Sequence, residues 1–116
     1  MIKHTKVQIT DNSGGIIGKI IGIYHRKDVK VGDIVRVAVK SVQPNKKVKK
    51  GEVYKAIVVR SCKKVDCEGG SVRFGDNAVI LLGENMQMIG TIVHGAVMRM
   101  ALNAFPQILP LCEEVY

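Results

Sequence analysis

Residues 34–40 read Ile-Val-Arg-Val-Ala-Val-Lys, an alternation of valines with other side chains. The three valines fall on one face of an extended chain, whereas Arg36 and Lys40 fall on the opposite face. Such a period of two is typical of a strand with one buried side, so the valines are expected to face the interior of a barrel. The stretch therefore predicts a β protein.

Similar short runs of β-branched residues recur from residue 6 to residue 82, separated by Gly, Asp, Asn and Pro. This pattern predicts an all-β barrel or sandwich. Gly18 and Gly22 interrupt one run, and glycine within a strand commonly marks a bulge or a barrel corner. Residues 56–59 are apolar on both faces, so the outer side of that strand is expected to be covered. The predicted strands are residues 6–10, 16–25, 34–42, 52–61 and 72–82, the last broken near residues 75–77, with turns at residues 11–14, 31–33 and 69–70.

The composition changes after Asn85, where charge falls and methionines appear at positions 86, 88, 98 and 100. Residues 96–102 are the best helix candidate, with Gly95 at the start, because apolar side chains recur there at helical spacing. Pro106 is expected to set a break before a second short turn around residues 107–109. A chain of 116 residues fits one domain, with a barrel over about residues 1–83 and a helical part over about residues 95–116.

Positive charge is concentrated in the first half of the chain. Residues 1–64 hold 16 of the 18 Lys and Arg residues and 4 acidic residues, whereas residues 65–116 hold 2 basic and 6 acidic residues. A basic surface raises the affinity of a folded domain for phosphate backbones or anionic membranes. The apolar stretches are far shorter than the roughly 20 residues of a membrane-spanning helix, and the N-terminus resembles neither a signal peptide nor a transit peptide, so we expect no membrane insertion.

The loop at residues 43–52 is the most specific local feature, because it clusters four lysines between two predicted strands. Like charges on one loop repel one another unless a polyanion compensates, so we predict a projecting basic hairpin that binds RNA. A merely solvated loop is the alternative. Aromatic residues are few, which favours folded RNA held by its backbone over stacked single strands. The predicted RNA-binding residues are His25, Arg26, Lys27, Lys30, Lys46, Lys47, Lys49, Lys50, Arg60, Lys63, Lys64 and Arg73.

Enzymatic and metal-binding patterns are missing from the sequence. It contains no nucleophile elbow, no P-loop and no conspicuous carboxylate pair. The segment Asp11-Asn12-Ser13-Gly14-Gly15 lacks the following Lys-Ser/Thr and helix of a P-loop, and turn chemistry explains it better. The three cysteines lack CxxC spacing and are expected to be free thiols. We therefore expect no enzymatic activity, no metal and no cofactor.

Six motifs, in order along the chain, resemble the L-fourteen family of large-subunit ribosomal proteins. They are Asp11-Asn12-Ser13-Gly14, Gly32-Asp33-Ile34, Val48-Lys49-Lys50-Gly51-Glu52-Val53, Lys55-Ala56-Ile57-Val58-Val59-Arg60, Arg73-Phe74-Gly75-Asp76-Asn77-Ala78 and Ile89-Gly90-Thr91. The resemblance spans essentially the whole chain. It implies a five-stranded β-barrel with a projecting basic hairpin and a small C-terminal helical segment, in a structural protein that binds large-subunit rRNA. A free RNA-binding barrel, such as a translation factor or RNA chaperone, is the alternative.

The same resemblance implies several partners at the subunit interface. Members of the family lie at the face that meets the small subunit, contribute to bridges with its rRNA, and pack beside proteins of the L-three and L-nineteen families. In bacteria and mitochondria a ribosome silencing factor docks on the C-terminal region. By position in this sequence, that surface would include Met98, Arg99 and Gln107.

Some positions depart from the family pattern towards fewer basic residues. The segment Gly15-Ile16-Ile17 stands where the family usually has Ala and a basic pair, and Ile92 stands where an Arg is usual. Asp66 and Glu68 acidify a segment that is often strongly basic. Such losses suggest a ribosome in which protein has taken over from RNA, which is a mitochondrial trait. We therefore expect a member from the mitochondrial matrix, with a bacterial cytoplasmic protein as the alternative.

Overall fold

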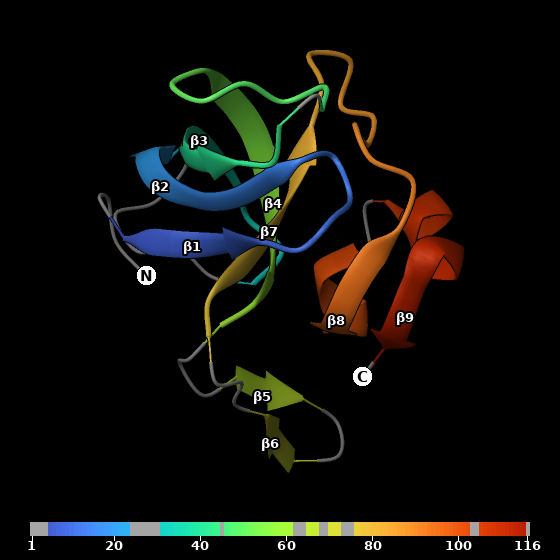
Figure 1. The fold of residues 1–116 in the computed structure, drawn as a ribbon. Helices are drawn as coiled ribbons and strands as arrows, with labels where there is room; N and C mark the ends of the chain where they lie inside the picture. The colour runs from blue at the N-terminus through green and yellow to red at the C-terminus, as the bar shows by residue number, and fades with distance from the viewer. Residues whose placement is uncertain are drawn as a thin grey trace.

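Five strands close into a barrel, which confirms the predicted architecture. The computed structural model describes residues 5–23, 31–44, 46–61, 65–67, 70–72, 76–102 and 105–115. The barrel consists of β1 (Lys6–Ile9), β2 (Gly15–Ile23), β3 (Ile34–Val42), β4 (Val53–Arg60) and β7 (Ala78–Leu82), in the order β1-β2-β3-β4-β7 (Figure 1). Neighbouring strands are antiparallel except β1 and β7, whose parallel pairing closes the ring.

Alternate side chains of each strand fill the barrel interior. The valines at positions 35, 37 and 39 are fully buried, whereas Arg36 and Lys40 on the other face of β3 are exposed. The orientation predicted for this strand is therefore confirmed. Burial removes the apolar surface of these branched side chains from water and so stabilises the closed barrel. The inner core comprises Val7, Ile9, Ile20, Val35, Val37, Val39, Val48, Ala56, Val58, Val79 and Leu81.

Strand β2 carries irregularities at the glycines that interrupt it. Its register against β3 shifts between Ile17 and Gly18 and again between Ile20 and Gly22, which confirms the predicted bulges. At Gly18 a Cβ atom would lie only 2.3 Å from Cγ1 of Val37. Glycine at this position therefore lets the β2 backbone approach the core closely.

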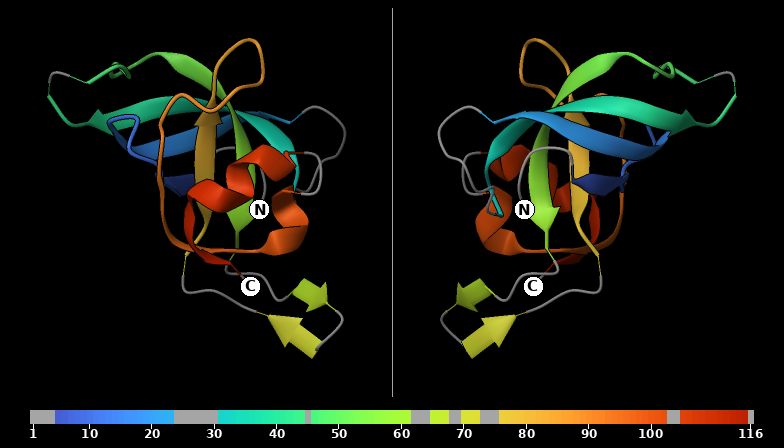
Figure 2. Two further views of the ribbon diagram at one scale, coloured as in Figure 1. Left: turned by 90° about the vertical axis from the view of Figure 1, so that its right-hand side faces the viewer. Right: turned by 90° about the vertical axis from the view of Figure 1, so that its left-hand side faces the viewer.

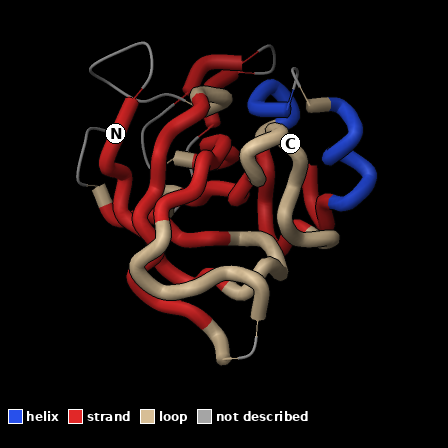
Figure 3. The backbone as a smooth tube through the Cα atoms, turned by 90° about the horizontal axis from the view of Figure 1, so that it is seen from above, coloured by secondary structure: helices blue, strands red, loops and turns tan. Residues whose placement is uncertain are grey.

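The outer side of β4 and β7 is covered by the C-terminal part of the chain. Ile57, Val59 and Ile80 point out of the barrel and are nevertheless fully buried, which confirms the cover predicted for residues 56–59. Figure 2 shows the C-terminal segment packed along the barrel, and from above its two helices lie on one side of the strands (Figure 3). The covering residues are Val93, Val97, Met98, Ala101, Leu102 and Ile108.

The C-terminal part contains two strands and two short 3-10 helices, namely β8 (Val93–Val97), η1 (Arg99–Leu102), η2 (Pro106–Leu111) and β9 (Cys112–Val115). The helix predicted over residues 96–102 is wrong for its beginning, because Ala96 and Val97 pair in parallel with β9. Gly95, at φ 76°, lies within β8 and not at a helix start. The second predicted turn, at residues 107–109, lies within η2. None of the helices in the described ranges is long and apolar enough to cross a membrane.

A second hairpin, which the sequence did not predict, extends from one end of the barrel (Figure 1). Strand β5 (Val65–Cys67) pairs with β6 (Gly70–Val72), and each has only three residues. Runs this short carry too little periodicity to be recognised as strands. The strand predicted over residues 72–82 divides as expected, because β6 ends at Val72 and β7 begins at Ala78.

Candidate nucleic-acid interface

Residues 43–52 join β3 to β4 and project from the barrel (Figure 2). We call this segment the basic hairpin. The side chains of Lys46, Lys47, Lys49 and Lys50 are all exposed. The lysines that the sequence singled out are therefore displayed together on one loop and are accessible to a large anionic partner.

A single buried residue, Val48, anchors the basic hairpin in its middle. Its side chain is only 2% exposed and belongs to the inner core of the barrel. The hairpin is also fixed at its end, where Gly51 N donates to Val39 O at 2.8 Å and Val39 N donates to Glu52 O at 2.9 Å. Two lysines thus stand on each side of a fixed point. Sequence reasoning missed this anchor, although one apolar residue inside a run of four lysines was a usable signal.

The base of the basic hairpin rests on the turn between β1 and β2. Gln43 N donates to Gly14 O at 2.8 Å. Gly14 has a φ of 113°, which favours glycine, and a Cβ atom there would lie 2.2 Å from Cβ of Lys46. Only glycine therefore allows the hairpin to pack this closely against the turn.

Asp11 holds the other side of the same turn. The carboxylate is buried, and it accepts hydrogen bonds from Ser13 Oγ at 2.6 Å, Ser13 N at 3.3 Å and Leu81 N at 3.2 Å. Burial raises the pKa of Asp11, and these three bonds oppose that shift. Because Leu81 lies on β7, which pairs with β1, Asp11 ties the turn to the neighbouring strand of the barrel. The structural role predicted for this segment is confirmed.

Asn12 connects the turn to the loop that leads into β8. Its Oδ1 accepts hydrogen bonds from Thr91 N at 2.6 Å and Ile92 N at 3.1 Å, and its Nδ2 donates to Thr91 Oγ1 at 2.9 Å. Gly90 lies so close that a Cβ atom there would be 2.5 Å from Asn12 Oδ1. One four-residue turn therefore positions both the basic hairpin and the segment before β8.

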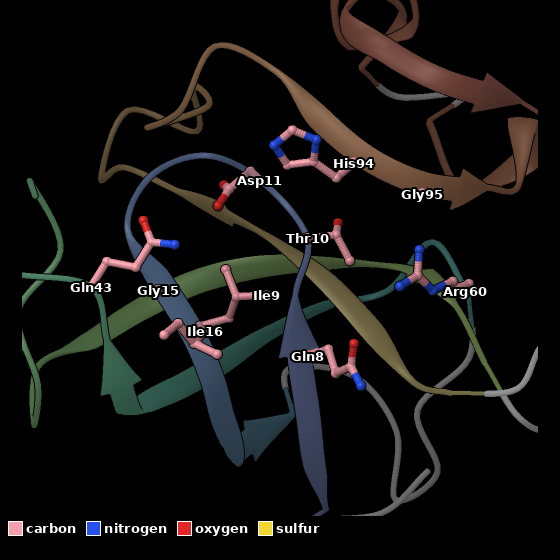
Figure 4. A pocket seen from close by; sticks show the side chains of 10 residues that line it. All are labelled: Gln8, Ile9, Thr10, Asp11, Gly15, Ile16, Gln43, Arg60, His94 and Gly95. Atoms are coloured by element: carbon pink, nitrogen blue, oxygen red, sulfur yellow. The ribbon is translucent and has the colours of Figure 1, made fainter.

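A shallow groove of about 330 Å³ crosses the outer face of the barrel over β1 (Figure 4). Its polar side chains include the amides of Gln8 and Gln43, the imidazole of His94 and the guanidinium of Arg60. The amides of Gln8 and Gln43 can donate hydrogen bonds to phosphate or ribose oxygens. In the described part of the chain, no group of three or more His, Cys, Asp or Glu side chains could hold a metal ion.

Arg60, one of the predicted RNA contacts, has a partner within the protein. Its Nε lies 2.6 Å from Asp76 Oδ1 and its Nη2 lies 3.1 Å from Asp76 Oδ2, so the pair is bidentate. The Arg60 side chain is only 12% exposed. A Cβ atom on Gly95 would lie 2.6 Å from Arg60 Nη1, so β8 also packs against the guanidinium. This placement favours a structural role for Arg60.

The remaining predicted RNA contacts lie outside the described residues. They are His25, Arg26, Lys27, Lys30, Lys63, Lys64 and Arg73, and they stay predictions.

The predicted protein-docking surface is only partly on the surface. Arg99 on η1 and Gln107 on η2 are exposed. Met98 is 2% exposed and packs in the outer core, so its inclusion in that surface needs correction. Met98 instead packs with Ala101, Leu102 and Ile108 of the two short helices.

The two C-terminal strands are also joined by side chains. His94 Nδ1 lies 3.1 Å from Glu113 Oε1, and Gly95 N donates to Glu113 Oε2 at 3.4 Å. The hydrogen bond with His94 lowers the pKa of the Glu113 carboxyl. Cys112 is a free thiol whose pKa is raised by burial. The contacts of Glu113 thus hold β9 against β8.

Comparison with known protein families gives one match that spans residues 1–116, the family of ribosomal protein L14p/L23e. The closed barrel and the ordered sequence motifs agree with that match. Proteins of this kind are structural components of ribosomes and not enzymes. The chain belongs to the ribosomal protein L14p/L23e family.

Proposed function

We propose that this protein is a structural constituent of the large ribosomal subunit and binds its rRNA through the basic hairpin. The observation that carries the proposal is the display of four exposed lysines around the buried Val48. A loop that is fixed in this way presents its charges without a large further loss of backbone freedom on binding. Lysine ammonium groups contact phosphates and so supply affinity and position, not base identity.

Three further basic segments extend the proposed rRNA contact. His25, Arg26, Lys27 and Lys30 lie on one predicted loop, Lys63 and Lys64 follow β4, and Arg73 follows β6. Arg60 enters this proposal only as a support, because its guanidinium is occupied by Asp76. Several separated basic points suit a folded RNA better than one single-stranded segment.

The C-terminal part is proposed to face the small subunit and neighbouring proteins. Arg99 and Gln107 are exposed there, and the acidic balance after residue 64 disfavours extensive RNA binding on that side. The proposed partners are small-subunit rRNA across the interface, large-subunit proteins of the L-three and L-nineteen families, and a ribosome silencing factor.

The proposed location is the ribosome of the mitochondrial matrix, with the bacterial cytoplasm as the alternative. Support comes from the exposed Ile16, Ile17 and Ile92, which stand at positions where the L-fourteen pattern usually has basic residues. Sedimentation of ribosomes from isolated mitochondria, with detection of this chain by mass spectrometry, tests the location directly.

The function itself is tested by subunit association. After a high-salt wash that removes loosely bound factors, the chain is expected to co-sediment with the large subunit. Replacement of Lys46, Lys47, Lys49 and Lys50 together by Ala is expected to lower incorporation at least several-fold while the barrel remains folded, because exposed charges contribute little to stability. The matched control replaces the same four lysines by Arg and is expected to assemble normally.

Two results would contradict the proposal. One is recovery of the wild-type chain only in the soluble fraction, together with tight binding to unstructured RNA, which is the behaviour of a free RNA-binding barrel. The other is undiminished incorporation of the four-Ala variant, which would remove the basic hairpin from the RNA contact.

A further inference from the structure

The strands β1, β2 and β3 carry basic residues on their outer face that no loop-based prediction included. Together these three strands contain four basic residues and no acidic or aromatic residue. Lys6, Arg36 and Lys40 are exposed, and Lys19 is half-buried. We call these four residues the strand face.

The register of the strands brings like charges together on this face. Lys6 on β1 lies directly opposite Lys19 on β2, and Lys19 lies opposite Ala38 on β3, whose same-face neighbours along the strand are Arg36 and Lys40. Directly opposed side chains on neighbouring strands are about 5 Å apart, and like charges at that distance destabilise a sheet. Within the described ranges, none of the four forms a salt bridge.

The rest of the barrel surface is either covered by other parts of the chain or carries both basic and acidic side chains. The outer side of β4 and β7 is covered by the C-terminal part, which also reaches the end of β1, where His94 N donates to Thr10 O at 2.7 Å. At the β4 end, Arg36 and Lys55 share a shallow groove with Glu52 and Glu84. The purely basic part of the strand face is therefore Lys6, Lys19 and Lys40.

The strand face leads into the basic hairpin. Lys40 lies near the end of β3, the strand from which the hairpin departs, and the β1–β2 turn contacts the hairpin base through Gly14. Positive charge thus extends from the hairpin across three neighbouring strands. No aromatic ring on these strands offers a base a stacking platform, so their chemistry suits phosphates of a folded RNA and not splayed single-stranded bases.

We propose that the outer face of β1, β2 and β3 is a second RNA-backbone contact, in which Lys6, Lys19 and Lys40 neutralise phosphates at the side of the barrel. The inference rests on the proposed rRNA-binding function and adds a contact independent of the basic hairpin. The bound phosphates relieve the Lys6–Lys19 repulsion, so the strand face is stable in the complex and mildly unfavourable in the free protein.

The test is a salt titration of RNA binding with purified protein. Filter binding to a transcript of the large-subunit rRNA is measured over a range of KCl concentrations for the wild type and for Lys6→Gln/Lys19→Gln/Lys40→Gln. If each lysine neutralises one phosphate, the slope of log K against log salt is expected to decrease by about 2–3 in magnitude, with affinity lower by tenfold or more at low salt. Replacement of the same three residues by Arg is the matched control and should retain the slope.

Thermal unfolding of the free variants separates binding from folding. The Gln variant is expected to melt at the same temperature as the wild type or slightly higher, because its substitutions remove a repulsion. A clear decrease in melting temperature with an unchanged salt slope would overturn the proposal and make the lysines structural.

The same titration separates failure of the strand-face contact from failure of the proposed rRNA-binding function. Loss of slope in the hairpin variant but not in the strand-face variant overturns the second contact and leaves the proposed function standing. Loss in both variants supports both contacts. Absence of wild-type binding to the transcript overturns the proposed function, and the strand-face proposal with it.

Discussion

The outer faces of two parts of the same barrel differ in burial: one is covered by the C-terminal part and the other is exposed to solvent. On β4 and β7, the outward-pointing Ile57, Val59 and Ile80 are fully buried beneath the C-terminal part. On β1, β2 and β3, the outward positions include lysines, an arginine and exposed isoleucines such as Ile17, which is 39% exposed. The interior of the barrel is equally apolar on both sides.

The difference shows that the residues on the outer face of a strand indicate whether that face is covered within the protein or open to a partner. A strand that is apolar on both faces requires a cover, and this chain supplies the cover itself. A strand with an apolar inner face and a basic outer face requires none to fold, so its charges are available to a partner. Four predictions test whether this division is real.

The largest effect is expected for an acidic substitution on the covered face. Ile57→Asp should lower the free energy of unfolding by roughly 3–5 kcal/mol, because it buries an unpaired carboxylate under the C-terminal part. Ile17→Asp is the matched control on the open face and should change it by less than about 1 kcal/mol. Urea unfolding measures both, and equal losses would show that the two faces are not different.

A smaller effect on the free energy of unfolding is expected at Asp11, which joins the β1–β2 turn to Leu81 on β7. Asp11→Asn should lower stability by about 2–3 kcal/mol, because one amide oxygen cannot accept all the hydrogen bonds that two carboxylate oxygens accept. Ser13→Ala removes one of those donors and should have a smaller effect.

The pH dependence at Asp11 has a defined sign. Its pKa is raised in the folded state, so the stability that arises from this shift is fully present below the unfolded value of 3.8 and is lost as pH rises through the folded pKa, whereas the hydrogen bonds to the carboxylate remain. The stability difference between wild type and Asp11→Asn should therefore be larger near pH 4 than near pH 7. A difference that is constant between these two pH values would contradict the assigned shift.

The smallest effect on stability is expected from a comparison of the paired Arg60 with the exposed Arg36. Arg60→Gln breaks the partly buried pair with Asp76 and should destabilise the protein by about 1–2 kcal/mol. Arg36→Gln, at an exposed position of the strand face, should leave stability within about 0.5 kcal/mol. A stability loss for Arg36→Gln with none for Arg60→Gln would reverse the roles assigned to the two faces.

The barrel could be predicted from sequence because alternation is a local property. Each of its signals can be recognised within a short stretch of sequence. These signals are the valines of residues 34–40, the glycines of β2 and the run in β4 that is apolar on both faces. The C-terminal part was harder. Val97 and Ala101 satisfy helical spacing, but pairing between β8 and β9, which are separated by two helices, determines that Val97 is in a strand.

The candidate interface was predictable in its charges but not in its contacts. The four lysines of the basic hairpin were evident from the sequence, whereas the burial of Val48 depends on how the loop folds back on the barrel. The pairing of Arg60 with Asp76 and the opposition of Lys6 and Lys19 depend on strand ends and register, which composition does not encode. The number of basic residues could therefore be read from the sequence. Which of them form pairs within the protein and which face solvent could not.

The parallel pairing of β1 with β7 has a consequence for the order of folding. Thr10 N can donate to Val79 O only after Val79, 69 positions further along the chain, has been made. During synthesis β2, β3 and β4 can pair as they emerge, because each is joined to the next by a local connection, but the ring cannot close before Leu82 is available. The first strand can pair with β2 early, but its parallel pairing with the last strand of the barrel must wait, and this long-range closure is expected to limit the folding rate.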